Sequence, residues 1–169
     1  MRSHCYDELV VFQAFSRIVA GARKELVIVD TAPTGHTPLL LDTVGAFHRQ
    51  MQRSFGGGNM RVVTPLMHLR DPDYTRVIIV TLPETTPVLE AQALQEDLRR
   101  ASIEPFAWVV NASLAAAQPR DTLLAQRAIA ELDEIRKVRD TLAHRFAVVP
   151  FLAEEPVGAE RLQQLARMG

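Results

Sequence analysis

The fold of this chain is decided by residues 26–37, which read Leu26-Val27-Ile28-Val29-Asp30-Thr31-Ala32-Pro33-Thr34-Gly35-His36-Thr37. Four apolar residues lead directly to an aspartate, and a turn-forming segment with proline and glycine follows it. This pattern predicts a buried strand that delivers Asp30 to its carboxyl end. In parallel sheets the carboxyl ends of the strands are where ligands bind, so we expect this segment to lie at a functional site.

Three further apolar runs rich in β-branched residues are typical of strands buried on both faces. They cover residues 77–80, 106–110 and 146–149. Segments with helical spacing alternate with these runs, at about 7–20, 37–51, 87–101, 120–144 and 159–167. The alternation predicts an α/β fold, in which a doubly wound parallel sheet carries helices on both faces.

For two of these helices the sequence also predicts which residues are buried. In the helix at about 87–101 we expect Thr86 as the N-cap and Pro87 at the first helical position. Its inner face is predicted to carry Val88, Ala91, Leu94 and Leu98. The helix at 120–144 is predicted to bury one stripe, which consists of Leu124, Ala128, Leu132, Ile135, Val138 and Leu142. Charged residues four apart predict that its other face is solvated, and these are Arg127 with Glu131 and Asp133 with Lys137.

Length, charge and hydropathy limit the class of protein. A chain of 169 residues has the usual size of one domain, so residues 1–169 are expected to form a single domain. A formal net charge of −1 offers no basic footprint, and we expect no nucleic-acid partner. No apolar run reaches the roughly 20 residues that cross a bilayer, and the chain starts without the apolar core of a signal peptide. The default compartment is therefore the cytoplasm.

Lysine is scarce, and this excludes one common nucleotide-binding motif. Only Lys24 and Lys137 occur among the 19 basic residues, and an arginine precedes each of them. Neither can belong to a Gly-Lys-Ser/Thr phosphate loop. Residues 53–67 contain a run of three glycines, but no lysine follows them, so this stretch is predicted to be a mobile loop between two helices.

Three residues are candidates for a functional site because of their chemistry. Nucleotide hydrolases place a carboxylate that reaches Mg²⁺ where Asp30 stands, but an aspartate that ends a strand is also a common loop residue. Asn111 follows the run at 106–110, and asparagine after a strand is a common turn residue. Cys5 is the single cysteine, so it is a packed thiol, a nucleophile or one ligand of a mixed site. The residues alone leave these alternatives open.

The octapeptide at 30–37 resembles the diagnostic motif of the arsenite-transporting ATPases, the soluble catalytic subunits of arsenical efflux pumps. Three other segments resemble the same family in the same order, and these are residues 11–17 (VFQAFSR), 81–91 (TLPETTPVLEA) and 153–158 (AEEPVG). Together they are similar to the C-terminal part of the second of two homologous ATPase halves. The resemblance implies part of a P-loop NTPase fold with a deviant Walker A motif.

This resemblance implies ATP and Mg²⁺ as cofactors and assigns roles to three residues. Asp30 is expected to face Mg²⁺ and Gly35 the terminal phosphate, as the catalytic residues of the second switch segment. Asn111 is expected to contact adenine. The family's usual Asn-Asn-Ser appears here as Asn111-Ala112-Ser113, which departs from the pattern at its middle residue.

The resemblance also implies a metalloid site for As(III) or Sb(III), which act as effectors. The matching ligands are Cys5 and His36, and Ser3 is placed for a weaker contact. Trivalent arsenic and antimony are thiophilic, which favours a thiolate as the strong ligand. His36 belongs to the same segment as Asp30 and Gly35. We therefore expect metalloid binding to move that segment relative to the nucleotide.

The expected function is that of a fragment of the cytoplasmic ATPase that couples ATP hydrolysis to arsenite and antimonite efflux. Because the phosphate loop is absent, the chain is expected to begin after that loop and to be nearly inert toward ATP alone, which leaves its status as an enzyme open. The implied partners are a membrane arsenite efflux protein and a complementary ATPase half that carries a phosphate loop. The expected location is the cytoplasm, peripheral to the inner membrane when the chain is bound to the pump.

Two other functions remain open. One is a stand-alone, non-catalytic module that binds metalloid or a partner's nucleotide domain. The other is a relative of the ATPases that target tail-anchored membrane proteins, whose eukaryotic members use a Cys-x-x-Cys zinc clamp and a methionine-rich groove. One cysteine and five scattered methionines disfavour this last function.

Overall fold

The computed structural model describes residues 18, 21, 26–30, 45 and 64–167. The chain falls into two compact units, one of residues 1–76 with 97–104 and one of residues 77–96 with 105–169. Each unit is described by itself, and the single domain expected for residues 1–169 stays a prediction. The helix predicted at 37–51 lies outside the described residues except for position 45, which is helical, as are positions 18 and 21 near the helix predicted at 7–20.

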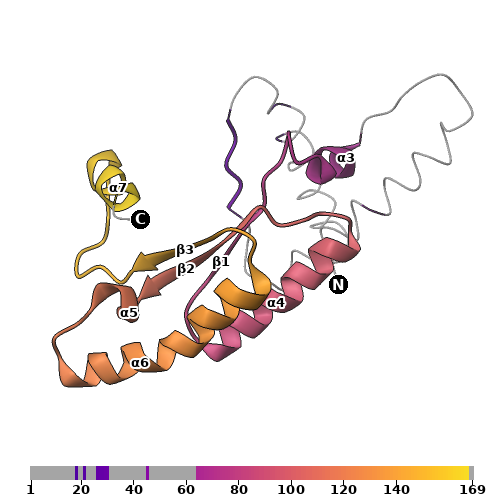
Figure 1. The fold of residues 1–169 in the computed structure, drawn as a ribbon. Coiled ribbons are helices and arrows are strands. Elements are labelled where there is room, and N and C mark those ends of the chain that lie inside the picture. The colour runs from indigo at the N-terminus through magenta and orange to yellow at the C-terminus, as the bar shows by residue number, and fades with distance from the viewer. Residues whose placement is uncertain (1–17, 19–20, 22–25, 31–44, 46–63, 168–169) are drawn as a thin grey trace, which may run out of the picture. The chain divides into compact units, whose positions relative to one another are not determined.

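A three-stranded parallel sheet forms the centre of the second unit (Figure 1). Its strands are β1 (Ile78–Thr81), β2 (Ala107–Ser113) and β3 (Phe146–Pro150), in the order β1-β2-β3. Ile78 pairs with Ala107, and Trp108 pairs with Phe146. The strands predicted at 77–80, 106–110 and 146–149 are therefore confirmed, together with the α/β class.

Burial alternates along the first two strands. Ile79 is 2% exposed, whereas its neighbours Ile78 and Val80 are 52% and 60% exposed. On β2, Trp108 and Val110 are buried. The prediction that every strand is buried on both faces is wrong for β1, and it is also wrong for β3, where Ala147 is exposed and the other residues are half-buried. Among the described residues of this unit, helices α4 and α6 run along the same side of the strands (Figure 1), so only that face of β1 is well covered.

Helix α4 (Thr85–Arg100) begins two residues before the predicted start at Pro87. The amide of Val88 donates to the carbonyl oxygen of Glu84 at 3.0 Å, which makes Glu84 the residue before the helix in place of the predicted Thr86. Pro87 is the third helical residue. Because the first N–H groups of a helix have no partner within it, proline fits there as well as at the first position. The sequence pattern could not separate these two registers.

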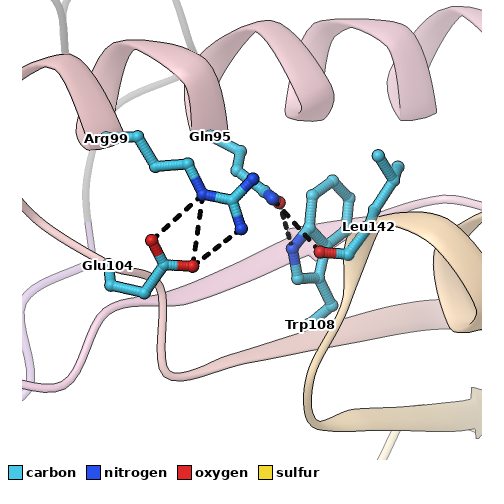
Figure 2. A network of polar contacts seen from close by, with 5 residues as sticks. All are labelled: Gln95, Arg99, Glu104, Trp108 and Leu142. Atoms are coloured by element: carbon cyan, nitrogen blue, oxygen red, sulfur yellow. Dashed lines mark hydrogen bonds and ion pairs between the residues drawn. The ribbon is translucent and has the colours of Figure 1, made fainter.

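The buried face of α4 carries a polar residue that apolar spacing does not reveal. Gln95 is 2% exposed, whereas Leu94, which we predicted to be buried, is only half-buried. Figure 2 shows the Gln95 amide between Trp108 of β2 and Leu142. Its Oε1 accepts from Trp108 Nε1 at 2.7 Å, and its Nε2 donates to the Leu142 carbonyl oxygen at 3.1 Å. One side chain thus satisfies a buried indole and a helix carbonyl.

The predicted long helix at 120–144 is two elements, α6 (Thr122–Lys137) and the π-helix η1 (Val138–Leu142). The Asp121 side chain caps α6 by accepting from the amides of Leu123 and Leu124, each at 3.0 Å. The buried stripe differs from the prediction. Leu124 and Leu132 are 40% and 36% exposed and Ile135 and Leu142 half-buried, whereas Ala128, Glu131 and Val138 are buried. The face toward the sheet therefore includes a carboxylate.

The last helix, α7 (Ala159–Ala166), agrees with the prediction at 159–167. It begins after Gly158, whose φ of 87° lies in the region that favours glycine. The described part of the chain contains no helix long and apolar enough to span a membrane.

In the first unit, helix α3 (Pro65–Arg70) begins inside the stretch predicted as a loop over 53–67, so the loop prediction is wrong for 65–67, whereas 53–63 lie outside the described residues. Proline at its first turn explains the start, since its missing N–H would have no partner there. Arg70 Nε donates to the carbonyl oxygen of Ala101 at 2.7 Å. Close to Ala101, Arg99 and Glu104 form an ion pair at 2.7 Å (Figure 2).

The same unit corrects the strand predicted at 26–29. Residues 26–30 have no strand structure, and Leu26 and Ile28 are 91% and 86% exposed. A parallel strand is stabilised by hydrogen bonds to a neighbouring strand, and no described residue supplies them to this segment. Apolar composition alone could not indicate whether a partner strand is present.

We predict that Gln95→Leu lowers the free energy of unfolding by roughly 1–3 kcal/mol, because the buried Trp108 N–H loses its acceptor. Urea unfolding followed by fluorescence measures this change, since Trp108 is the single tryptophan of the chain. Gln92→Leu is the matched control, because Gln92 lies on the same helix and makes only a 3.5 Å contact with Glu96. An equal loss of stability in both variants would contradict the role given to Gln95.

Candidate functional site

The carboxyl ends of the three strands lie at one edge of the sheet because all three strands are parallel. The strands end at Thr81, Ser113 and Pro150. In open parallel sheets, ligands bind outside this edge. The segments that follow these three residues are therefore the candidate site in this unit.

Asn111 lies at this edge, but inside β2 and not after it as predicted. Val110 pairs with Val148 and Ser113 with Pro150, so β2 advances three residues while β3 advances two. The extra residue makes a β-bulge, in which Ala112 has a φ of 55°. The bulge interrupts the regular ladder at Asn111, and this residue is exposed.

Ser113 anchors the bulge at its carboxyl side and is fully buried. Its carbonyl oxygen accepts from the amide of Phe151 at 2.9 Å, which joins β2 to the residue after β3. Its Oγ accepts from the amide of Ala116 at 3.1 Å and caps the short helix α5 (Leu114–Ala117). Backbone and side chain of Ser113 are thus both fixed.

The side chain of Glu131, a residue of α6, extends to Ser113 and is only 6% exposed. Its Oε2 accepts from Ser113 Oγ at 3.0 Å and from the amide of Ala115 at 3.0 Å. The prediction that Glu131 lies on a solvated face, paired with Arg127, is wrong. Its spacing from the buried Ala128 and Val138 is a usable signal, because steps of three and seven residues keep a side chain on one helix face. A search for apolar residues alone passes over it.

The segment after β1 is held by the same helix. Arg127 Nη2 lies 3.1 Å from Glu84 Oε1, and Thr85 Oγ1 donates to Glu134 Oε1 at 2.7 Å. Thr81, the last residue of β1, is 6% exposed, and its Oγ1 donates to the Leu82 carbonyl oxygen at 3.2 Å. Side chains of α6 therefore contact the segments that follow both β1 and β2.

Of the other predicted site residues, only Asp30 is among the residues that the structure describes. Asp30 is described and exposed, and it belongs to the first unit. Ser3, Cys5, Gly35 and His36 lie outside the described residues. Within the described ranges, no three His, Cys, Asp or Glu side chains gather in a way that could hold a metal ion. One carboxylate such as Asp30 still fits Mg²⁺ held mainly by water and nucleotide phosphates.

Comparison with known proteins relates this chain to a family. The sequence profile described as "Anion-transporting ATPase" matches residues 1–68 and 61–168. This chain belongs to the anion-transporting ATPase family. The parallel α/β sheet agrees with membership of this family. The name of the family indicates ATP as the nucleotide.

The most informative relatives of this family member are named as arsenical pump-driving ATPases. The protein from Acidiphilium multivorum is 53% identical over 165 residues, and one from Escherichia coli is 52% identical over 166 residues. Each match covers 98% of this chain but only 28% of the relative. A more distant relative, "ATPase get3" from Pyrenophora tritici-repentis, is 28% identical over 201 residues, which is 96% of this chain and 58% of that protein.

We predict that Ala112→Asn stabilises this member of the anion-transporting ATPase family by about 0.5–1 kcal/mol, because asparagine tolerates a left-handed backbone better than alanine. Urea unfolding followed by Trp108 fluorescence measures the difference. Ala116→Asn is the matched control, since Ala116 is helical and asparagine is the poorer helix former. Destabilisation by both variants would contradict the bulge geometry at Ala112.

Proposed function

We propose that this chain is part of an ATPase that drives arsenite and antimonite efflux, and that it supplies magnesium, adenine and metalloid contacts to that enzyme. The observation that carries the proposal is the identity of 53% and 52% with two arsenical pump-driving ATPases over 98% of this chain. The identity with "ATPase get3" is lower, at 28%, which supports the function of the pump ATPases over that of this relative.

We assign the nucleotide contacts of this chain to Asp30, Gly35 and Asn111. The Asp30 carboxylate would supply an oxygen for Mg²⁺ or its water, and glycine at position 35 would let the backbone approach the terminal phosphate without a side chain in the way. The Asn111 side chain carries both a donor and an acceptor, which suits the edge of an adenine base. The exposure of Asn111 at the carboxyl edge of the sheet supports this role.

The phosphate loop must come from elsewhere in the assembled enzyme, because neither lysine of this sequence follows a glycine. We assign it to a complementary ATPase half. By itself the chain is expected to hydrolyse ATP poorly, since most phosphate-binding amides and the charge-neutralising lysine belong to that loop. The remaining partner is a membrane efflux protein, which would hold the cytoplasmic enzyme at the inner membrane.

The metalloid effector would be bound by Cys5 and His36, with a weaker contact from Ser3. This proposal rests on the sequence resemblance and on chemistry, because the cysteine thiolate is the strongest ligand for As(III) or Sb(III) that the chain contains. His36 follows Gly35 directly, so a ligand bond at the imidazole would act on the phosphate-facing segment.

We expect arsenite-stimulated ATP hydrolysis when this chain is mixed with an ATPase half that carries a phosphate loop. Asp30→Asn should lower the rate by roughly two orders of magnitude, because charge stabilisation by the metal ion contributes several kcal/mol to catalysis. Phosphate release measured with and without arsenite gives the result. Asp71→Asn is the matched control, since Asp71 is exposed and lies outside the proposed site.

Two results would contradict this proposal. One is a mixture that hydrolyses ATP no faster than the phosphate-loop half alone. The other is equal activity of Asp30→Asn and Asp71→Asn. If the chain binds arsenite without any partner while no hydrolysis appears, the non-catalytic metalloid-binding module becomes the better description.

The metalloid site has its own test. Cys5→Ser should abolish the retention of arsenic on the protein after gel filtration, because the hydroxyl is a far weaker ligand than the thiolate. Ser3→Ala should retain most of the arsenic, which elemental analysis of the protein fraction measures. Undiminished arsenic in the Cys5→Ser sample would exclude Cys5 as a ligand.

A further inference from the structure

One face of α6 contacts both segments that follow β1 and β2 at the carboxyl edge of the sheet. The contacting residues stand at positions i, i+4 and i+7 of the helix, and they are Arg127, Glu131 and Glu134. Such spacing keeps side chains on one face of a helix. Arg127 and Glu134 contact Glu84 and Thr85, whereas Glu131 contacts Ser113 and Ala115.

These contacts differ in how strongly they can fix their partners. The side chains of Arg127 and Glu84 are 66% and 53% exposed, and an exposed ion pair contributes little because water and salt screen it. Glu131 is 6% exposed, and a single oxygen of it accepts two hydrogen bonds. Loss of a buried acceptor leaves buried donors without partners, which is a much larger penalty. Glu131 is therefore the contact that can control local conformation.

The β-bulge at Ala112 needs neighbouring contacts that hold its backbone conformation. Ala112 has a φ of 55°, and a residue with a Cβ persists in this region only when its surroundings hold it there. Ser113 is the neighbouring residue, and its hydroxyl donates to Glu131. Without that acceptor, Ala112 can return to an extended conformation. A one-residue change of register would then turn Ser113, now buried on the same face as Val110, to the other face of the strand and change the backbone around Asn111.

We propose that Glu131 is a positioning residue for Asn111. Its carboxylate holds the Ser113 hydroxyl and the Ala115 amide, and this keeps Ala112 in the left-handed region and Asn111 outside the regular ladder. Glu131 acts through Ser113 and does not touch a nucleotide. The proposal deepens the proposed function, because it rests on Asn111 as the adenine contact, and it makes nucleobase recognition depend on a residue of α6.

Nuclear magnetic resonance of the ¹⁵N-labelled chain tests this positioning without any nucleotide. Glu131→Leu removes the acceptor, and we expect the Asn111 resonances to shift and the Ala115 and Ala116 amides to exchange about ten times faster or more. Glu131→Gln keeps a carbonyl oxygen and should restore the wild-type pattern. Asp133→Asn, with its side chain 87% exposed on the same helix, is the control for lost charge and should change neither signal.

Wild-type Asn111 resonances in Glu131→Leu would overturn the positioning role, even if the variant were less stable. Equal behaviour of Glu131→Gln and Glu131→Leu would also overturn it, because the acceptor would then not matter. If Glu131→Leu fails to fold, Ser113→Ala serves as the second variant, because it removes the hydroxyl that links Glu131 to the bulge. We then expect the same shift of the Asn111 resonances, and unchanged Asn111 resonances would overturn the positioning role.

Titration with ATP separates this inference from the proposed function. Shifts of the Asn111 side-chain amide on addition of ATP to the wild-type chain, combined with an ATPase half that carries a phosphate loop, support the adenine contact, and GTP should cause smaller shifts. If ATP leaves Asn111 unchanged, the adenine role fails. The free-state comparison of Glu131→Leu with Glu131→Gln still decides whether Glu131 positions Asn111.

Discussion

Parallel pairing of β1, β2 and β3 is the constraint on which the rest of the described structure depends. It brings the carboxyl ends of three strands to one edge, although Thr81, Ser113 and Pro150 are far apart in the sequence. The pairing is supported from one face by α4, where the Gln95 amide satisfies the buried indole of Trp108. An apolar residue at that position would leave the indole N–H without a partner. The core of this unit therefore depends on a polar group as well as on apolar contacts.

At the carboxyl edge the regular ladder gives way to a bulge, which places Asn111 at the surface. The bulge holds Ala112 in an unfavourable backbone conformation, and buried polar contacts from Ser113 and Glu131 surround it. Local strain of this kind persists only where neighbouring structure over-determines it. Asparagine, which the family resemblance implies at position 112, would fit this geometry better than alanine, because asparagine tolerates the left-handed region. The departure at Ala112 thus has a physical meaning that the sequence alone did not provide.

The sequence predicted the apolar strands of the second unit and the last helix closely, because strand and helix periodicities are local properties. It missed the buried Gln95 and placed Glu131 on a solvated face, since a search for apolar stripes passes over polar residues. It also placed Asn111 after β2, because a bulge is fixed by pairing with β3 and leaves no local signal. The strand predicted at 26–29 is absent for a similar reason, because a strand needs a partner that composition does not reveal. The roles of Cys5 and His36 depend on the family resemblance.

The most direct test of the central claim is photolabelling with 8-azidoadenosine triphosphate, which attaches to protein close to the adenine base. The chain, combined with an ATPase half that carries a phosphate loop, would be irradiated, digested with trypsin and analysed by mass spectrometry. Cleavage after Arg100 and Arg120 yields residues 101–120 as one peptide that contains Asn111. We expect this peptide to carry the label and excess ATP to prevent the labelling. Label that is confined to other peptides of the chain would contradict an adenine site at this edge.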